Sequence, residues 1–160
     1  MLVLVCYIGV QLAGHRTRVS GSAMYPTLED SDSIVIDRIS YRFVKPARFD
    51  VVVFPSKFQE GIYYIKRVIA LPGETVRISD GQILINGEEL KEPYDFDPIE
   101  SGGLASTQIT LGEDEYFVLG DNRNASSDSR EPIIGNIRGE DMIGKAVMRI
   151  WPFDRIGMIR

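Results

Sequence analysis

Lys66 is the residue whose setting most suggests chemistry, because it lies in the middle of the apolar segment YYIKRVIA (63–70). On a strand, alternation would direct one of the two neighbouring basic side chains, Lys66 or Arg67, toward an apolar surface. Burial lowers the pKa of a lysine, and a neutral amine can act as general base to a serine hydroxyl. The alternative is a strand lysine whose amine reaches solvent.

Two further segments carry residues suited to a catalytic site. SGSAMYPTL (20–28) has the composition of a strand end, and GDNRNASSDSR (120–130) predicts a polar loop after a buried strand. The sequence holds one histidine, His15, and one cysteine, Cys6, which excludes a zinc site built from several such ligands. His15 lies in the polar stretch GHRTR and is expected to face solvent, so a hydrolase of this sequence needs another base.

The elements that must position these residues are mostly strands. Short β-branched and aromatic segments separated by Gly, Pro, Asp and Ser predict strands at 33–38, 50–55, 63–70, 116–120 and 145–150. Asp80-Gly81 predicts a hairpin turn, and Asn86-Gly87 predicts a second turn. Prolines and glycines interrupt the pattern over 88–112, which indicates an irregular excursion or small cap. Since only 139–144 suggests even one helical turn, the fold class is mostly β.

Composition places limits on the partners. The 160 residues correspond to one domain, and 44% hydrophobic with 26% charged residues is ordinary for a globular protein. The net charge of −5 argues against a phosphate-backbone binder, so no nucleic-acid partner is expected.

The apolar run MLVLVCYIGV (1–10) is shorter than the roughly 20 residues that a bilayer-spanning helix needs. It is compatible with a buried core segment, with the end of a longer transmembrane segment, or with a signal peptide. The last is disfavoured because no basic region precedes the run and no clear cleavage site follows it. Cys6 has the properties of a small buried hydrophobe.

The three segments around Ala23, Lys66 and Ser126, in this order, resemble type I signal peptidases, which are membrane-anchored Ser-Lys endopeptidases that remove signal peptides from exported preproteins. The resemblance extends over 19–159 and includes a family-like ending, WPFDRIG (151–157). It implies an antiparallel β-sheet catalytic domain, a cell-membrane location with a single-pass anchor, and an extracytoplasmic active site that needs no metal or cofactor. The implied boundaries are an anchor remnant at 1–12, a β core at 13–78 and 116–160, and a small cap at 79–115.

One position departs from the family pattern. The family motif reads small-Ser-Met-x-Pro-Thr-Leu, and Ala23 stands where the nucleophilic serine is expected. Without a hydroxyl, the chain as written cannot form an acyl-enzyme. Ala23 is either a replacement that traps an inactive enzyme or the mark of a naturally inactive homologue, and the retained Lys66 favours the first. Ser22 is no ready substitute, because adjacent strand side chains point to opposite faces.

The resemblance assigns roles to the other residues. Lys66 is the general base, Ser126 orients it, and the backbone N–H of Ala23 contributes to the oxyanion hole. The charged residues expected to support the loop are Asp121, Asp128 and Arg130. The residues expected to line shallow apolar pockets for small side chains at the first and third positions before the cut are Val19, Met24, Leu28, Tyr64 and Ile65. Core packing is the alternative role for each residue of that last set.

Two other functions stay open. A non-catalytic protein similar to signal peptidases could assist the assembly of pilins or surface proteins, and Ala23 would then be encoded by nature. A self-cleaving regulator of the repressor type is disfavoured, because the sequence holds no recognisable DNA-binding module.

Overall fold

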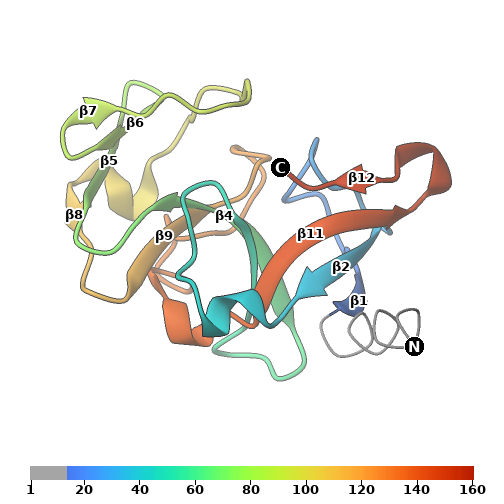
Figure 1. Cartoon of the computed structure of the whole chain (residues 1–160). Coiled ribbons are helices and arrows are strands. Elements are labelled where there is room, and N and C mark those ends of the chain that lie inside the picture. Colours follow the sequence, from blue (N-terminus) through green and yellow to red (C-terminus); the bar gives the residue numbers. More distant parts are fainter. Residues whose placement is uncertain (1–13) are drawn as a thin grey trace.

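The computed structural model describes residues 14–160, which form two antiparallel sheets with short 3-10 helices between strands (Figure 1). The sequence segment 1–12 and Cys6 lie outside the described residues, so the interpretations of that run stay open. Within residues 14–160, no helix has the length and hydropathy needed to cross a membrane.

The larger sheet has eight strands and carries the segments singled out by their chemistry. Its order is β1-β2-β11-β3-β4-β9-β10, with β12 paired to β11. The bounds are β1 Gly14–Arg18, β2 Ser33–Asp37, β3 Val51–Pro55, β4 Tyr63–Ala70, β9 Glu115–Leu119, β10 Ile137–Arg138, β11 Gly144–Trp151 and β12 Gly157–Met158. All five strands expected from composition are therefore present, and within the described residues β1 forms one edge of the sheet.

The smaller sheet has four strands in the order β7-β6-β5-β8. Its bounds are β5 Thr75–Ser79, β6 Gln82–Ile85, β7 Glu88–Glu89 and β8 Ile109–Thr110. Both sequence-predicted turns join its strands: Asp80 and Gly81 have φ of 54° and 77°, and Asn86 and Gly87 have φ of 51° and 83°. Positive φ at both central residues is the requirement that selects Asn-Gly and Asp-Gly there.

Four 3-10 helices connect the strands of the described part. They are η1 Ser40–Arg42, η2 Gly103–Ser106, η3 Gly139–Asp141 and η4 Phe153–Arg155. The helical turn suggested for 139–144 corresponds to η3. The division into a core and a cap at 79–115 stays a prediction, and the small sheet begins before it, at Thr75.

Apolar clusters cover both faces of β4. Val68 packs with the cluster that includes Val118, and Ile69 packs with the cluster beneath the smaller sheet. Because neither face is open to water, Lys66 and Arg67 are both buried, with 3% and 0% of their surface exposed. Alternation alone predicted burial of one of them, and the structure buries both.

The buried positive charge of Arg67 is neutralised by an ion pair with Asp121, which follows β9. The Arg67 Nε and Nη2 donate to the two Asp121 carboxylate oxygens at 2.8 and 2.6 Å, and both side chains are fully buried. Arg67 Nη1 also donates to the Phe49 carbonyl at 2.9 Å. The pair therefore fastens β4 to the loop after β9 and to the segment before β3.

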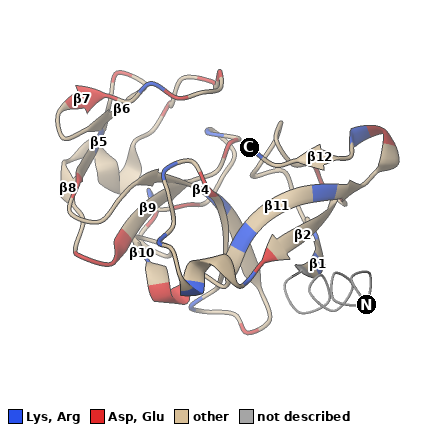
Figure 2. Ribbon diagram, in the orientation of Figure 1, with Lys and Arg blue, Asp and Glu red and all other residues tan. Residues whose placement is uncertain are grey.

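Two basic side chains of β11 fasten further segments (blue bands on β11 in Figure 2). Lys145 Nζ pairs with Asp50 at 2.6 Å. Arg149 Nη1 donates to buried Asp32 at 3.2 Å and to the Thr27 carbonyl at 2.9 Å. Arg149 thus holds the segment 20–28 against the large sheet.

We expect Arg67→Met to lower the free energy of unfolding by about 3–5 kcal/mol, because it leaves the Asp121 carboxylate buried without its partner. The matched control is Arg138→Met, since Arg138 pairs with Glu140 where both side chains are 59% exposed. The control substitution should lower the free energy of unfolding by less than about 1 kcal/mol. Urea unfolding followed by circular dichroism compares the two variants, and equally small losses would contradict a stabilising role for the buried pair.

Candidate active site

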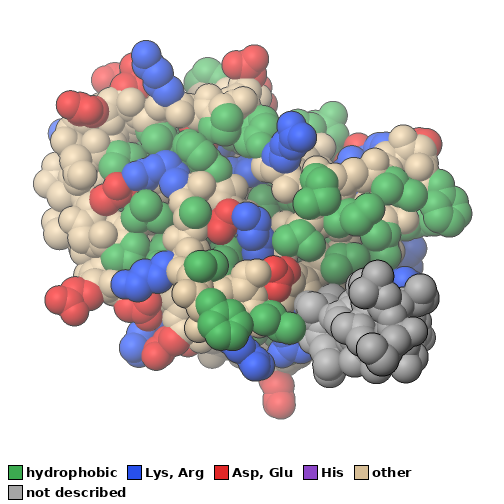
Figure 3. Space-filling model, viewed as in Figure 1, with side chains coloured by type: hydrophobic (Ala, Val, Ile, Leu, Met, Phe, Trp, Pro, Cys, Tyr) green, Lys and Arg blue, Asp and Glu red, His purple; other side chains and the backbone are tan. Residues whose placement is uncertain are grey.

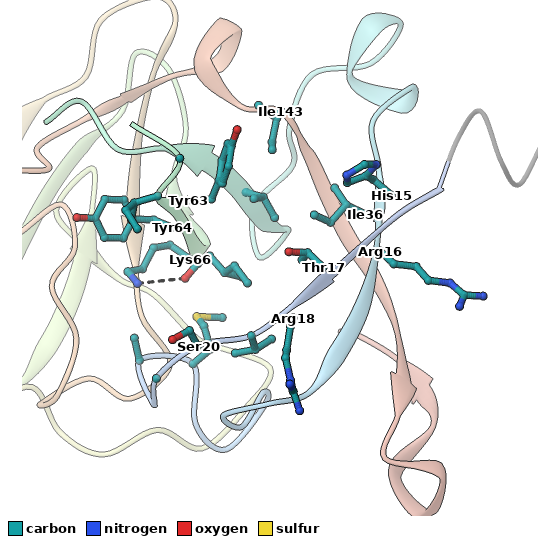
Figure 4. Close-up of a pocket in the computed structure, with 18 of the residues that line it drawn as sticks. His15, Arg16, Thr17, Arg18, Ser20, Ile36, Tyr63, Tyr64, Lys66 and Ile143 are labelled. Atoms are coloured by element: carbon teal, nitrogen blue, oxygen red, sulfur yellow. Dashed lines mark hydrogen bonds between the residues drawn. The ribbon is translucent and has the colours of Figure 1, made fainter. Parts of the chain in front are cut away.

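A pocket of about 600 Å³ lies between β1 and the start of β4, and Ala23 and Lys66 both line it (Figure 4). The side chain of Thr17 on β1 points into it, while Tyr63 and Tyr64 reach it from β4. The chemistry-bearing segments around Ala23 and Lys66, which are distant in sequence, thus meet at one cavity.

The Lys66 amine is held in an apolar setting. Lys66 Nζ donates to the Ile65 carbonyl at 3.1 Å and lies 5.6 Å from the centroid of the Tyr64 ring. Burial lowers the pKa of Lys66, and the opposing effect of nearby carboxylates, chiefly Asp128 and Asp121, is weaker. The environment therefore shifts the amine toward its neutral form, the form that can accept a proton.

Ala23 lies in a series of turns, not at a strand end. β1 ends at Arg18, and the Leu28 N–H donates to the Met24 carbonyl at 2.9 Å. Strand alternation therefore does not determine where the Ser22 side chain points, and that prediction is wrong, because 21–28 folds into turns. Ser22 is exposed.

Asn122 ties the Ala23 turn to the loop 120–130. Its backbone N–H donates to the Ala23 carbonyl at 3.0 Å, and its side-chain amide donates to the Ser22 carbonyl at 3.1 Å. Since these contacts reach the backbone of 22 and 23, they do not depend on the side chain at either position.

Gly120 allows the loop to approach Ala23 closely. A Cβ at Gly120 would lie 2.0 Å from Ser126 Oγ and 2.5 Å from the Ala23 carbonyl oxygen, distances that real Cβ atoms do not adopt. Ser126 Oγ is buried and has no hydrogen-bond partner among the described residues. The hydrogen bond expected from the resemblance, between Ser126 and Lys66, is thus not formed in this structure.

The three charged loop residues expected from the resemblance are buried and paired with one another or with β4. Asp121 binds Arg67, and Arg130 donates to Asp128 through Nε and Nη2, both at 2.8 Å. The Asp128 carboxylate also accepts from the backbone N–H groups of Gly120, at 3.1 Å, and Arg130, at 3.2 Å. These pairs fix the backbone of the loop where it faces Ala23.

The predicted substrate-binding residues divide into two groups. Val19, Met24, Tyr64 and Ile65 line the pocket together with Ala23 and Lys66. Leu28 is fully buried in the cluster beneath the pocket, where it packs with Val19 and Met24. His15, predicted to face solvent, is exposed at the rim of the pocket (Figure 4).

Sequence reasoning missed three residues that organise the site: Thr27, Gly120 and Asn122. The Thr27 hydroxyl donates to Asp121 at 2.5 Å and accepts from Arg67 Nη2 at 3.3 Å. The one available signal was a second basic residue, Arg67, in an apolar strand, because a buried arginine requires an acidic partner.

Comparison with known proteins places this arrangement in a family. The family model described as "Signal peptidase, peptidase S26" matches residues 1–151. Signal peptidase I of Leptolyngbya laminosa is 37% identical over 98% of this chain and 78% of its own length. Probable signal peptidase I-2 of Synechocystis sp. is 38% identical over 88% of this chain and 65% of its own length.

A solved structure gives the same result for the fold. The crystal structure of a signal peptidase I from Enterococcus faecalis matches with a TM-score of 0.50 and 37% identity, over 64% of this chain and 97% of that one. The prediction of a mostly antiparallel β fold is thereby confirmed. Because the family model matches residues 1–151 of its 160 residues, the chain belongs to the signal peptidase S26 family.

Proposed function

We propose that this chain is a serine endopeptidase domain of the signal peptidase I type, whose active form removes N-terminal signal peptides from exported preproteins. The observation that carries the proposal is that buried Lys66, with its lowered pKa, lines the same pocket as Ala23. The names of the relatives, signal peptidase I, support the same activity.

In the active form, a serine at position 23 attacks the carbonyl carbon of the scissile peptide bond while neutral Lys66 accepts its proton. The tetrahedral oxyanion is stabilised by the backbone N–H of residue 23. The leaving amine takes the proton from Lys66, and the acyl-enzyme is then hydrolysed by a water that Lys66 deprotonates. Ala23 lacks the attacking oxygen, so the chain as written binds substrate without cleaving it.

Ser126 is assigned the role of orienting Lys66. Its hydroxyl is buried without a partner, and such a group is costly unless another polar group reaches it. We expect the Lys66 amine to meet this hydroxyl when the site is assembled with substrate. The supporting residues of the loop are Asp121, Asp128 and Arg130.

An extended substrate is proposed to pair its backbone with strand edges beside the pocket. β1 is an edge strand within the described residues and contributes to the pocket wall, which supports β-strand addition there. Val19, Met24, Tyr64 and Ile65 would then accept small side chains before the cut, with Leu28 packed beneath them.

We also propose that the domain works at the outer face of the cell membrane, with 1–12 belonging to a single-pass anchor. In support, apolar side chains gather over the turn between β11 and β12, at the right of Figure 3. The exposed apolar residues of this turn and of the strand ends beside it are Trp151, Phe153, Ile156 and Met158. Exposed apolar groups of this kind mark membrane or protein contacts.

We expect Ala23→Ser to cleave a peptide that carries Ala-x-Ala before the cut, in detergent, with products identified by mass spectrometry. The chain with Ala23 should leave the peptide intact. Adding Lys66→Met to Ala23→Ser should reduce the rate by about 100- to 10,000-fold, because the base is lost.

Ser22→Ala in the Ala23→Ser background is the matched control and should keep full activity. Full activity of the Lys66→Met double variant would refute the Ser-Lys mechanism. If Ala23→Ser is folded and still does not cut, the chain is instead a non-catalytic protein that assists pilin or surface-protein assembly.

We expect Lys66→Met to change the pH dependence of stability. Burial lowers the Lys66 pKa below its ordinary value of 10.5. At pH values between this lowered pKa and 10.5, the unfolded chain therefore binds more protons than the folded chain. The parent therefore gains stability as pH rises through this interval, and the methionine variant does not. Its stability advantage over the parent should therefore shrink as the pH rises toward 10.5.

Urea unfolding at several pH values measures this advantage. Lys57→Met, at an exposed position, controls for the loss of one positive charge. An advantage of Lys66→Met that stays constant over the interval would contradict a buried amine with a lowered pKa.

A further inference from the structure

A segment outside the pocket covers the buried ion pair of Arg67. This strap, residues 92–98, follows β7 and precedes η2, and it belongs to the yellow-green stretch beyond β7 in Figure 1. The Tyr94 ring centroid lies 4.9 Å from Arg67 Cζ. The Phe96 ring centroid lies 4.1 Å from Arg123 Cζ and 6.0 Å from Arg67 Cζ. Two aromatic rings thus stack on two buried guanidinium groups.

Polar contacts join the strap to the loop 120–130. Glu92 forms an ion pair with Arg123, whose side chain is 1% exposed. The Asn124 side-chain amide donates to the Pro98 carbonyl at 3.0 Å. Just beyond the strap, the Glu100 N–H donates to the Asn124 side-chain oxygen at 3.0 Å. The strap is therefore bound to the loop along its length.

Arg123, which pairs with the strap, also forms hydrogen bonds with the part of the loop that faces Ala23. Arg123 Nε donates to the Gly120 carbonyl at 3.1 Å, and the Arg123 carbonyl accepts from Arg130 Nη2 at 2.6 Å. Gly120 is the residue that lies against both the Ala23 carbonyl and Ser126. The orientation of Arg123 therefore affects how closely the loop approaches the Ala23 turn.

Arg67 provides a second connection between the strap and the active site. It follows Lys66 directly on β4, and through Asp121 and Thr27 it connects that strand to the loop and to the Ala23 turn. The Tyr94 and Phe96 rings, which contact each other edge to face at 5.9 Å, lie over its guanidinium. Neither ring lines the 600 Å³ pocket, so neither is placed to touch substrate there.

We propose that the strap is a positioning element of the active site, in which Tyr94 and Phe96 orient Arg67 and Arg123 and so set the loop 120–130 against Lys66 and the Ala23 turn. This inference rests on the proposed peptidase function. Tyr94 and Phe96 are positioning residues, since they act through the two arginines. A small displacement of the loop is enough to reduce turnover strongly, because reacting groups tolerate errors of less than about 1 Å.

The test uses the Ala23→Ser chain with Tyr94→Leu and Phe96→Leu together, which keep apolar bulk and remove both ring faces. We expect kcat to fall about tenfold or more, with KM changed less than about twofold. We also expect the acidic limb of the kcat–pH profile to move to higher pH, because a loosened loop admits water to Lys66. Phe96→Tyr keeps a ring and should stay within about twofold of the parent.

Phe43→Leu is the matched control, since Phe43 is an aromatic residue that is 82% exposed, outside the strap and the pocket. It should leave kcat and the pH profile unchanged. A fall in kcat that only follows the folded fraction, with the acidic limb unmoved, would overturn the proposal.

Hydrogen exchange on the chain with Ala23 tests the strap without any cleavage. In the double leucine variant, the amides of Gly120 and Asn122, which donate to Asp128 and to the Ala23 carbonyl, should exchange at least about tenfold faster. Amides of β2 should be unaffected. Unchanged exchange at Gly120 and Asn122 overturns the positioning role, whereas inactivity of Ala23→Ser with faster exchange overturns the peptidase proposal alone.

Discussion

The buried ion pair between Arg67 and Asp121 is the constraint around which the other parts of the site are arranged. Both side chains are fully excluded from water, and either charge would be costly to bury alone. β4 and the loop after β9 therefore have to fold together. Thr27 joins the same pair through its hydroxyl, although it lies 94 residues from Asp121 in sequence. One interaction thus sets the relative positions of the Ala23 turn, the lysine strand and the loop.

This pair also bears on the proton affinity of Lys66. Burial lowers the pKa of Lys66, whereas Asp128, Asp121 and Glu131 act in the opposite direction. The two larger of these opposing effects come from Asp128 and Asp121, and an arginine side chain donates two hydrogen bonds to each of these carboxylates. Their charges are matched by Arg67 and Arg130, and desolvation is the largest effect on the pKa of Lys66. The arginines therefore limit how far these carboxylates can raise the pKa of Lys66, although neither arginine is a proton acceptor.

Local signals were sufficient for the five strands β2, β3, β4, β9 and β11 and for the turns at Asp80-Gly81 and Asn86-Gly87, because periodicity and positive φ act over a few residues. They did not predict β1, or β7 and β8 within 88–112, where an irregular segment was expected. Burial on both faces of β4 was not predictable, since it depends on clusters contributed by distant strands. The turns around Ala23 are likewise stabilised by contacts with Asn122, about 100 residues away. The contacts of Tyr94 and Phe96 with the arginines lie in a stretch without periodicity, where the sequence gives no pairing signal.

The contacts that position the site around residue 23 are independent of the side chain at that position. Asn122 binds the carbonyls of residues 22 and 23, and Gly120 lies against the backbone of Ala23. Lys66 is buried by β4 and its neighbours, and within residues 14–160 the one hydrogen bond of its amine is to its own strand. None of these contacts uses the side chain of residue 23. Since a serine differs from alanine by one oxygen, a hydroxyl introduced at this position would enter a pocket where Lys66 and the neighbouring loop are already positioned by the fold.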